Sequence, residues 1–451
     1  MDTSAQLSNA PQPPQPITLA ESFRYWLKLG FISFGGPAGQ ISMMHQELVE
    51  KRRWISEHRF LHALNYCMLL PGPEAQQLAT YIGWLMHGVR GGIIAGVLFV
   101  LPSLFILIVL SWIYLAFGDV SAVQGALYGI KPAVTAIVAF AAWRIGSRVL
   151  NNTVLWGLAA AAFLAIFAFH IPFPAIVLAA AILGYVGGQV APDKFRAGDG
   201  HAASLKDYGP ALIDDHSPTP EHAKFRRGRL VKYCVIGLAL WGILIGLLAA
   251  LFGWGGALTQ MGWFFTKAAL VTFGGAYAVL PYVYQGGVEH YHWLTGPQMI
   301  DGLALGETTP GPLIMVVAFV GFVGGWTGVL FGADNLFLAG ATAACVVTLF
   351  TFLPSFLFIL IGGPIVEATH GDIKFTAPLA AVTAAVVGVI LNLALFFAYH
   401  VLWPQGFAGA FDWISVAIGS AAFIALFRFK VDIVRVIFVC ALVGLAARMI
   451  G

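Results

Sequence analysis

Hydrophobic residues follow one another along this chain in long uninterrupted runs. Two of these runs, 92–118 and 336–362, contain no charged residue. Each is long enough to cross about 30 Å of hydrocarbon as a helix. About thirteen hydrophobic segments can be placed, at roughly 25–44, 61–86, 92–118, 122–142, 153–169, 172–190, 233–252, 258–284, 298–323, 335–362, 376–399, 411–427 and 431–449. The pattern predicts an all-α integral membrane protein.

Composition supports this prediction. Hydrophobic residues make up 59% of the 451 residues and charged residues only 10%, and the net charge is +3. So small a net charge says little about partners, and nothing in the sequence indicates a nucleic-acid binder. The four cysteines lie in or beside hydrophobic segments and show no CxxC spacing, and no histidine pair has the spacing of a zinc site. We therefore predict no metal, no cofactor and no enzymatic activity.

The chain contains an internal duplication, which is seen when its two ends are aligned. The motifs that recur 239 residues later are Lys28, Phe34-Gly35-Gly36, Trp54 and Pro71-Gly72-Pro73, which return as Lys267, Phe273-Gly274-Gly275, Trp293 and Pro310-Gly311-Pro312. Further along, Leu101-Pro102-Ser103 returns as Leu353-Pro354-Ser355. Duplicated hydrophobic segments that Gly and Pro interrupt are typical of secondary transporters.

The duplication divides the chain into five parts. They are a flexible tail at 1–20, a first repeat at 21–190, a polar linker at 191–232, a linking transmembrane helix at 233–257 and a second repeat at 258–451. Basic residues concentrate in the linker and near Arg144 and Arg148, so these regions are predicted to be cytoplasmic. Because one unpaired segment follows the linker, the second repeat begins on the opposite face, which predicts an inverted-topology repeat.

The first two segments of each half allow two arrangements. The loop between them is basic in the first repeat, with Lys51, Arg52 and Arg53, but carries no Lys or Arg between Glu289 and Trp293 in the second. If the pair of segments at the start of each half forms a re-entrant hairpin of broken helices, every basic loop is cytoplasmic. Full crossing of these segments remains the alternative, and the orientation of the halves is the same in both arrangements.

The Gly-Gly and Pro-Gly-Pro motifs predict helix breaks inside the membrane. Proline removes a backbone donor and glycine loosens the backbone, so each helix stops and restarts, leaving free N–H groups at the new N-terminus. Together with the helix dipole, these groups can bind an anion without a charged side chain. Each motif alone can be a packing device, but four of them, two from each half, predict a single central site.

The same motifs resemble the chromate ion transporter family in its long, two-domain form. The resemblance rests on FGGPAGQ and LLPGPEAQQLATYIGW in the first half, and on TFGGAYAVLPYV and GETTPGPLIMVVAFVGF in the second. It covers nearly the whole chain except the tail and the linker. The resemblance implies a bacterial inner-membrane protein that exports chromate, with its homologous halves in opposed orientation.

Ionisable residues within apolar segments are further site candidates, because each is costly unless it faces a cavity or a partner. Lys131 is the strongest candidate for direct anion contact, with snorkelling to the interface as its alternative. Glu74 and Glu307 either cap helices or carry protons. The full predicted substrate site comprises Lys28, Phe34, Gly35, Gly36, Pro71, Gly72, Pro73, Glu74, Lys131, Lys267, Phe273, Gly274, Gly275, Glu307, Thr308, Thr309, Pro310, Gly311 and Pro312.

The sequence thus predicts a secondary transporter that exports chromate by alternating access and confers chromate resistance. The membrane potential alone can drive export of a dianion, and proton coupling is permitted but not required. Sulfate or another oxyanion is the alternative substrate, and an anion channel is the alternative mechanism. The predicted partners are chromate and the lipid bilayer, and the sequence leaves open both sulfate transport and a homodimer.

Overall fold

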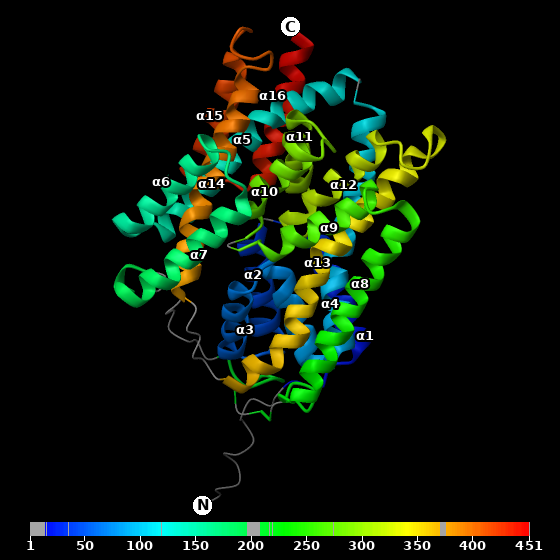
Figure 1. Ribbon diagram of the computed structural model, residues 1–451, viewed down its shortest axis with the longest axis vertical. Helices are drawn as coiled ribbons and strands as arrows, with labels where there is room; N and C mark the ends of the chain where they lie inside the picture. Colours follow the sequence, from blue (N-terminus) through cyan, green and yellow to red (C-terminus); the bar gives the residue numbers. More distant parts are fainter. Residues whose placement is uncertain are drawn as a thin grey trace, which may run out of the picture.

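The computed structural model describes residues 14–450, except 15, 35, 119, 196–207, 216, 219, 274 and 370–375. These described residues form helices joined by short loops, and their only β-structure is an isolated bridge between Ile55 and Ile213. Figure 1 shows the helices as one elongated bundle. The protein is therefore all-α in its described residues, as the hydrophobic pattern predicts.

The helices follow the same order in the two halves, except that the second half has two helices where the first half has one long helix at Glu74–Ala116. In the first half they are α1 (Leu19–Ile32), α2 (Gly36–His45), the π-helix η2 (Gln46–Lys51), α3 (Glu57–Leu69), α4 (Glu74–Ala116), α5 (Ser121–Val149), α6 (Thr153–Phe167) and α7 (Phe173–Val190). α8 (Arg227–Phe252) links the halves. In the second half they are α9 (Ala257–Leu270), α10 (Ala276–Tyr284), the π-helix η4 (Gln285–His290), α11 (Gly296–Thr308), α12 (Val316–Thr327), α13 (Leu336–Thr369), α14 (Thr376–Leu402), α15 (Trp413–Phe427) and α16 (Ile433–Ile450). Short 3-10 turns lie at Pro192–Lys194, Leu313–Met315 and Ala333–Asn335.

Six helical stretches among the described residues are long and apolar enough to cross a membrane. They are Glu74–Ala116, Ser121–Val149, Phe173–Val190, Arg227–Phe252, Ala333–Glu367 and Ala377–Leu402. Three shorter apolar helices, Thr153–Phe167, Leu313–Thr327 and Trp413–Phe427, accompany them. The chain is a multi-pass membrane protein.

The internal repeat extends to details of the backbone. Both π-helices occupy the same place in the repeat, and each is followed by a non-glycine residue with positive φ, Arg53 at 52° and His292 at 53°. The Trp54 N–H then donates to the Leu48 carbonyl, and the Trp293 N–H to the Gly287 carbonyl, both at 2.7 Å. Equivalent sequences 239 residues apart therefore fold alike.

Three boundaries differ from those expected from hydropathy. α4 joins the second part of the segment at 61–86 to the segment at 92–118 through a kink at His87 and Gly88, where Gly88 has φ 64°. α5 continues to Val149, which places Arg144 inside a helix and not in a loop. α8 begins at Arg227, five residues before the expected end of the linker. Charged residues end a hydropathy segment, but they do not end a helix.

The described part of the linker packs against the first half. The Ile213 N–H donates to the Trp54 carbonyl at 3.1 Å, and the Ser56 N–H donates to the Ile213 carbonyl at 3.0 Å. A ring nitrogen of His222 lies 2.8 Å from the carbonyl of Trp84, close to the kink in α4. The linker and the loop after the first π-helix therefore lie at the same end of the bundle.

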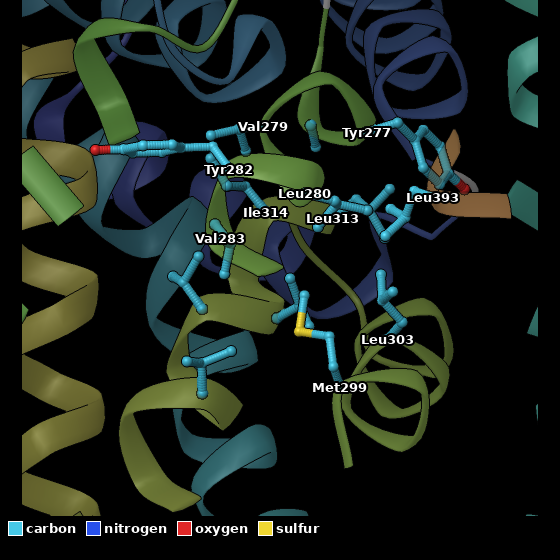
Figure 2. Close-up of a cluster of buried hydrophobic side chains, with 14 of the residues drawn as sticks. Tyr277, Val279, Leu280, Tyr282, Val283, Met299, Leu303, Leu313, Ile314 and Leu393 are labelled. Carbon is cyan, nitrogen blue, oxygen red and sulfur yellow. The ribbon is translucent and has the colours of Figure 1, made fainter. Parts of the chain in front are cut away.

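The two hairpins of broken helices occupy different ends of the molecule. In Figure 1, α1, α2 and α3 lie in the lower half of the view, and α10, α11 and α12 lie in the upper half. The second hairpin is the more deeply buried: Figure 2 shows Val279 of α10 and Met299 and Leu303 of α11 in one apolar cluster. The central breaks lie between these two hairpins.

Candidate functional site

Each of the four predicted breaks is present. α1 ends at Ile32 and α9 at Leu270, and the chain becomes helical again at Gly36 and directly after Gly275, which have φ values of 69° and 96°. α3 and α11 end before the two Pro-Gly-Pro motifs, where Gly72 has φ 126° and Gly311 has φ 102°. Only glycine adopts such angles without strain, which explains why these motifs interrupt the helices.

The breaks of one half are hydrogen-bonded to the breaks of the other. The Gly72 N–H donates to the Thr272 carbonyl at 2.8 Å, and the Gly311 N–H donates to the Ser33 carbonyl at 2.9 Å. Gly72 and Gly311 are equivalent in the repeat, and so are Ser33 and Thr272. The two contacts are therefore the same contact made twice, with the halves exchanged. We call these two meeting points the Gly72 junction and the Gly311 junction.

Each junction also receives a serine from the half opposite its glycine. A Cβ built on Gly72 would lie 2.4 Å from Ser355 Oγ, and a Cβ on Gly311 would lie 2.9 Å from Ser103 Cβ. These are the serines of the repeated Leu-Pro-Ser motif, on α13 and α4. The duplication thus has a structural meaning: each Pro-Gly-Pro lies against the Ser of the other half.

Several polar groups at the junctions are buried without a protein hydrogen-bond partner. They include the Oγ atoms of Ser33, Ser103 and Ser355 and the Oε1 atoms of Gln40 and Gln77. All five side chains belong to residues that are buried from solvent. An unpaired buried polar group costs about 1–3 kcal/mol, so such groups normally have a bound molecule or a functional role.

The two glutamines are held by their amide nitrogens. Gln40 Nε2 donates to the carbonyls of Ser33 at 3.1 Å and Gly311 at 2.5 Å, and Gln77 Nε2 donates to the carbonyl of Pro71 at 2.8 Å. Sequence reasoning missed both glutamines because their counterparts in the repeat are valines, Val279 and Val316. It also left Ser103 and Ser355 unassigned, although their duplication was the signal that could have found them.

The predicted basic residues lie in three different settings. Lys28 is exposed on α1, and Lys267 is half-buried with its Nζ 5.8 Å from the ring centre of Trp263. Lys131 Nζ lies 3.4 Å from Oδ2 of the buried Asp301 on α11. Neither of these two contacts joins a lysine to a junction. The structural partner of Lys131 is Asp301, and contact between Lys131 and the anion stays a prediction.

The predicted acids and threonines lie beside the breaks. Glu74 is the first residue of α4, and Glu307 accepts a hydrogen bond from the Tyr277 hydroxyl. Arg144 of α5 is near enough to both Tyr277 and Glu307 to interact with them electrostatically. The hydroxyls of Thr308 and Thr309 donate to carbonyls of their own helix, at 2.9 Å each. Arg144 is thus a basic group near a break that sequence reasoning assigned to a loop.

The remaining predicted residues belong to the breaks themselves. Gly72, Pro73, Pro310, Gly311 and Pro312 are buried, whereas Phe34 is exposed and Gly36, Pro71, Phe273 and Gly275 are partly exposed. Gly35 and Gly274 lie outside the described residues. The Pro-Gly-Pro motifs are therefore the enclosed side of the centre, and the Phe-Gly-Gly motifs are its more open side.

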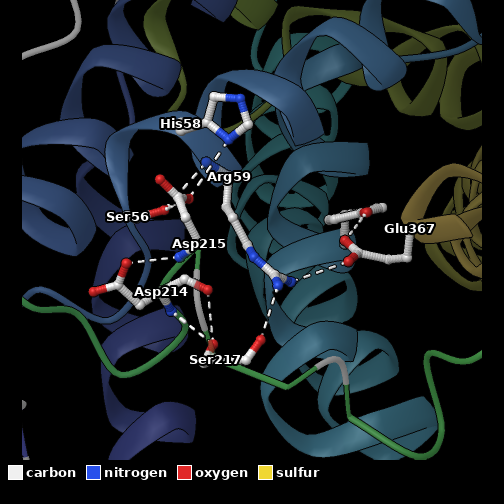
Figure 3. A network of polar contacts seen from close by, with 8 residues as sticks. Ser56, His58, Arg59, Asp214, Asp215, Ser217 and Glu367 are labelled. Atoms are coloured by element: carbon white, nitrogen blue, oxygen red, sulfur yellow. Dashed lines mark hydrogen bonds and ion pairs between the residues drawn. The ribbon is translucent and has the colours of Figure 1, made fainter. Parts of the chain in front are cut away.

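Two clusters of charged and tyrosine side chains lie away from the breaks, each joining the two halves. In the linker-side cluster, Glu367 of α13 accepts from Arg59 at 3.0 Å and from the Tyr81 hydroxyl at 2.5 Å. Figure 3 shows that Arg59 also reaches Ser217 of the linker. In the far-side cluster, Asp301 pairs with Lys131 and accepts from the Tyr114 hydroxyl at 2.9 Å.

Comparison with known proteins identifies the family of this chain. The family model described as "Chromate transporter" matches residues 20–185 and 259–445, which are the two repeats. A chromate transport protein of Pseudomonas aeruginosa is 32% identical over 96% of this chain and 93% of its own length. One from Cupriavidus metallidurans is 30% identical over 86% of this chain and 87% of its own.

A third relative matches only part of the chain. An uncharacterized transporter of Bacillus subtilis is 31% identical over 26% of this chain and 65% of its own length. No solved structure matches. The repeated Gly-Gly and Pro-Gly-Pro breaks, their contacts across the two halves and these matches lead to the same conclusion, which confirms the resemblance of the motifs. This chain belongs to the chromate transporter family.

Proposed function

We propose that this protein is a secondary transporter that exports chromate by alternating access, using one central site shared by two oppositely oriented halves. The observation that carries the proposal is the reciprocal pair of hydrogen bonds at the Gly72 and Gly311 junctions. Reciprocal contacts between equivalent residues define a two-fold relation between the halves. A site on such an axis can be presented to either face of the membrane by equivalent movements of the two halves.

The arrangement of α7 and α8 supports inverted halves. The Phe173 N–H at the start of α7 donates to Gln285 of the second hairpin, whereas Val190 at its end leads into the linker. α8 then returns from the linker to the start of α9. The two hairpin loops therefore lie near opposite ends of α7, as an inverted repeat requires.

Contacts of the linker support re-entrant hairpins. The loop at Trp54 and Ser56 is hydrogen-bonded to Ile213, so the first hairpin turns on the linker side. That loop and the linker are both rich in Lys and Arg, and the positive-inside rule assigns both to the cytoplasm. A hairpin that enters and leaves on the cytoplasmic side satisfies both observations, with residues 191–232 cytoplasmic and the protein in a bacterial inner membrane.

The chemistry of the centre suits an oxyanion. Helices that restart inside the membrane direct N–H groups and positive dipole ends toward the breaks. Ser103 and Ser355 add hydroxyl donors, and Arg144 adds a nearby positive charge. Two relatives over most of the chain are chromate transport proteins, so chromate is the proposed substrate. Sulfate is the nearest competitor because it has the same shape and charge.

The membrane potential is sufficient to drive export. One charge moving through 100 mV gains about 2.3 kcal/mol, so a dianion leaving an inside-negative cell gains about 4.6 kcal/mol. That energy sustains a gradient of roughly three decades, which is enough to confer chromate resistance. Glu74 and Glu307, which begin and end helices at the breaks, are the proposed proton carriers if export is also proton-coupled.

Counterflow in proteoliposomes tests the proposal. Vesicles that contain the purified protein and unlabelled chromate are expected to accumulate labelled chromate from outside, faster than vesicles loaded with buffer. Trans-stimulation of this kind distinguishes a carrier from a channel. Uptake that is insensitive to internal chromate, together with single-channel currents in planar bilayers, would favour a channel. An absence of chromate uptake would refute the transport assignment itself.

A further inference from the structure

We propose that the two junctions bind the oxyanion in a form that carries one hydrogen, and that they thereby select hydrogen chromate over sulfate. The inference rests on the proposed function and names the protonation state of the substrate and the side chains that recognise it. Its basis is that each junction combines a buried hydroxyl that can donate with a buried amide oxygen that can only accept.

The donors are the repeated serines. Ser103 faces the Gly311 junction and Ser355 faces the Gly72 junction, and the Oγ of each is buried without a protein partner. A hydroxyl can donate to a charged oxygen of an oxyanion, and a hydrogen bond to an ionised group is the stronger kind. The two serines come from equivalent positions on α4 and α13. The two halves therefore contribute equivalent hydroxyl donors, one at each junction.

The acceptors are the two glutamines. The Nε2 of Gln40 donates to two backbone carbonyls, so exchanging its amide oxygen and nitrogen would place the oxygen against two carbonyl oxygens. The same argument fixes Gln77 through the carbonyl of Pro71. In both residues, Oε1 is the atom left without a partner. An amide oxygen can only accept, and it repels an oxyanion oxygen that carries no hydrogen.

Each junction therefore contains a hydroxyl of the repeated serines and an amide oxygen that can only accept, although the two glutamines are not equivalent in the repeat; the Gly311 junction also has the unpaired hydroxyl of Ser33. Gln40 lies at the Gly311 junction with Ser103, and Gln77 lies at the Gly72 junction with Ser355. A fully deprotonated oxyanion satisfies the serines but leaves both amide oxygens unpaired. An oxyanion with one O–H satisfies the serines and donates to one glutamine.

Simple acid chemistry turns this requirement into selectivity. Chromate takes up a proton close to neutral pH, whereas sulfate does so only in strong acid. Near neutral pH, only chromate supplies the O–H that the glutamines accept. A site built to bind a substrate hydroxyl strongly rejects an analogue that lacks it, because its own buried groups are then left unpaired. Export of hydrogen chromate moves one proton with each anion, so the membrane potential acts on one net charge.

Other ionisable groups surround the junctions, and any pH experiment must distinguish their titration from the titration of the substrate. On the helices that pack around the breaks, the titratable and charged side chains include Tyr25, Lys28, His45, Cys67, Glu74, Tyr114, Lys131, Arg144, Lys267, Tyr277, Asp301 and Glu307. Further along α3, α4 and α13 are Tyr66, Tyr81 and Glu367. Competition by an anion that does not titrate distinguishes a proton on the substrate from a proton on the protein.

The test is equilibrium binding of labelled chromate to the purified full-length protein, from mildly acidic to mildly alkaline pH. We expect the apparent affinity to fall with rising pH in proportion to the fraction of hydrogen chromate. Sulfate and selenate, which carry no hydrogen in this range, are expected to need at least about a hundredfold excess to compete. Sulfate that displaces chromate at equal concentration would overturn the inference, and so would chromate affinity that stays constant or rises with pH.

Four substitutions locate the donors. Ser103→Ala and Ser355→Ala are each expected to raise the dissociation constant for chromate about tenfold, because each removes a hydrogen bond to a charged group. The matched controls are Ser111→Ala on α4 and Thr348→Val on α13, which remove other buried hydroxyls without a partner. The controls are expected to stay within about twofold of wild type. Equal effects of the site variants and their controls would contradict the assignment.

The outcomes separate this inference from the proposed function. If the wild-type protein carries chromate but sulfate competes equally, the transporter assignment stands and the protonated substrate is refuted. If the wild-type protein neither binds nor carries chromate, the proposed function fails first. Monodispersity of each variant in size-exclusion chromatography checks folding, and the wild-type binding experiment requires no variant.

Discussion

The contacts at the centre of this molecule follow the internal repeat, whereas the contacts in the linker-side and far-side clusters do not. At the centre, the hydrogen bond between Gly72 and Thr272 is equivalent to the one between Gly311 and Ser33. Likewise, Ser355 lies against Gly72 as Ser103 lies against Gly311. The linker-side and far-side clusters both contain an acid, a base and a tyrosine that join the halves. Their members, however, come from positions that do not correspond in the repeat.

The sequence shows this lack of correspondence directly. Gln298 stands where the repeat would place an equivalent of Arg59, and His62 stands where it would place one of Asp301. A centre that serves both faces of the membrane needs equivalent groups from both halves. In the proposed arrangement the two ends face different compartments, so each end can have its own charged contacts. Substitutions at the centre and at the ends test whether the repeated geometry of the centre matters more for transport than the charges at the ends.

The largest effect is expected at the centre. Gly72→Ala and Gly311→Ala force a side chain into a backbone conformation with positive φ and into contact with Ser355 or Ser103. Strain of about 1–3 kcal/mol at a site that must fit its substrate should lower chromate transport by more than about tenfold. The control is Gly242→Ala on α8, where a Cβ meets nothing within 4 Å. Transport by Gly72→Ala at the control level would mean that the junctions are not the site.

The linker-side cluster is expected to show the next largest effect, on stability. Arg59→Gln leaves Glu367 buried without its charge partner; the side chains are 12% and 8% exposed. Breaking such a pair costs about 3 kcal/mol, measured as unfolding of the protein in detergent. The double variant Arg59→Gln/Glu367→Gln should recover most of that loss. A double variant no more stable than the single one would show that the two residues do not act as a pair.

A smaller loss of stability is expected at the far-side cluster. Lys131 is 32% exposed, so water weakens its interaction with Asp301. Lys131→Gln should destabilise the protein by about 1–2 kcal/mol, and adding Asp301→Asn should restore stability. The Km for chromate should change little. A Km raised about tenfold, with stability unchanged, would instead place Lys131 in contact with the anion.

The smallest effects are expected at the repeated lysines. Lys28 is exposed, so Lys28→Gln should leave Km within about twofold of wild type, a difference of about 0.4 kcal/mol. Lys267→Gln should cost about 0.5–1 kcal/mol of stability, because it removes the contact with the Trp263 ring. A Km raised severalfold in both variants would show that the repeated lysines reach the substrate and would enlarge the proposed site.

Much of the centre could be predicted from sequence because its glycines and prolines have strong local effects. Gly36, Gly72, Gly275 and Gly311 all have positive φ at helix breaks, as their motifs indicate. The duplication also marked Ser103 and Ser355. Their role could not be recognised from sequence, because each serine acts on a glycine of the other half, and only the fold brings the two together.

Other parts of the site carried no signal along the chain. Gln40 and Gln77 look like ordinary polar residues near helix starts, and neither is repeated. Lys131 lies beside a proline inside an apolar run, and this position made it a site candidate. Its partner Asp301, however, lies on a segment distant in the sequence. Charges inside a membrane indicate that partners exist. They do not indicate which residue the partner is.

The central claim, that the two halves face opposite sides of the membrane, is tested most directly by labelling two equivalent positions. Pro16 and Gly255 precede the first helix of each half by the same interval of the repeat, and both are exposed. Each is changed to cysteine in a protein from which Cys67, Cys234, Cys345 and Cys440 have been removed. Intact cells are then treated with an impermeant thiol reagent. We predict that Gly255→Cys is labelled from outside and that Pro16→Cys is labelled only after permeabilisation; labelling of both from the same side would contradict the inverted arrangement.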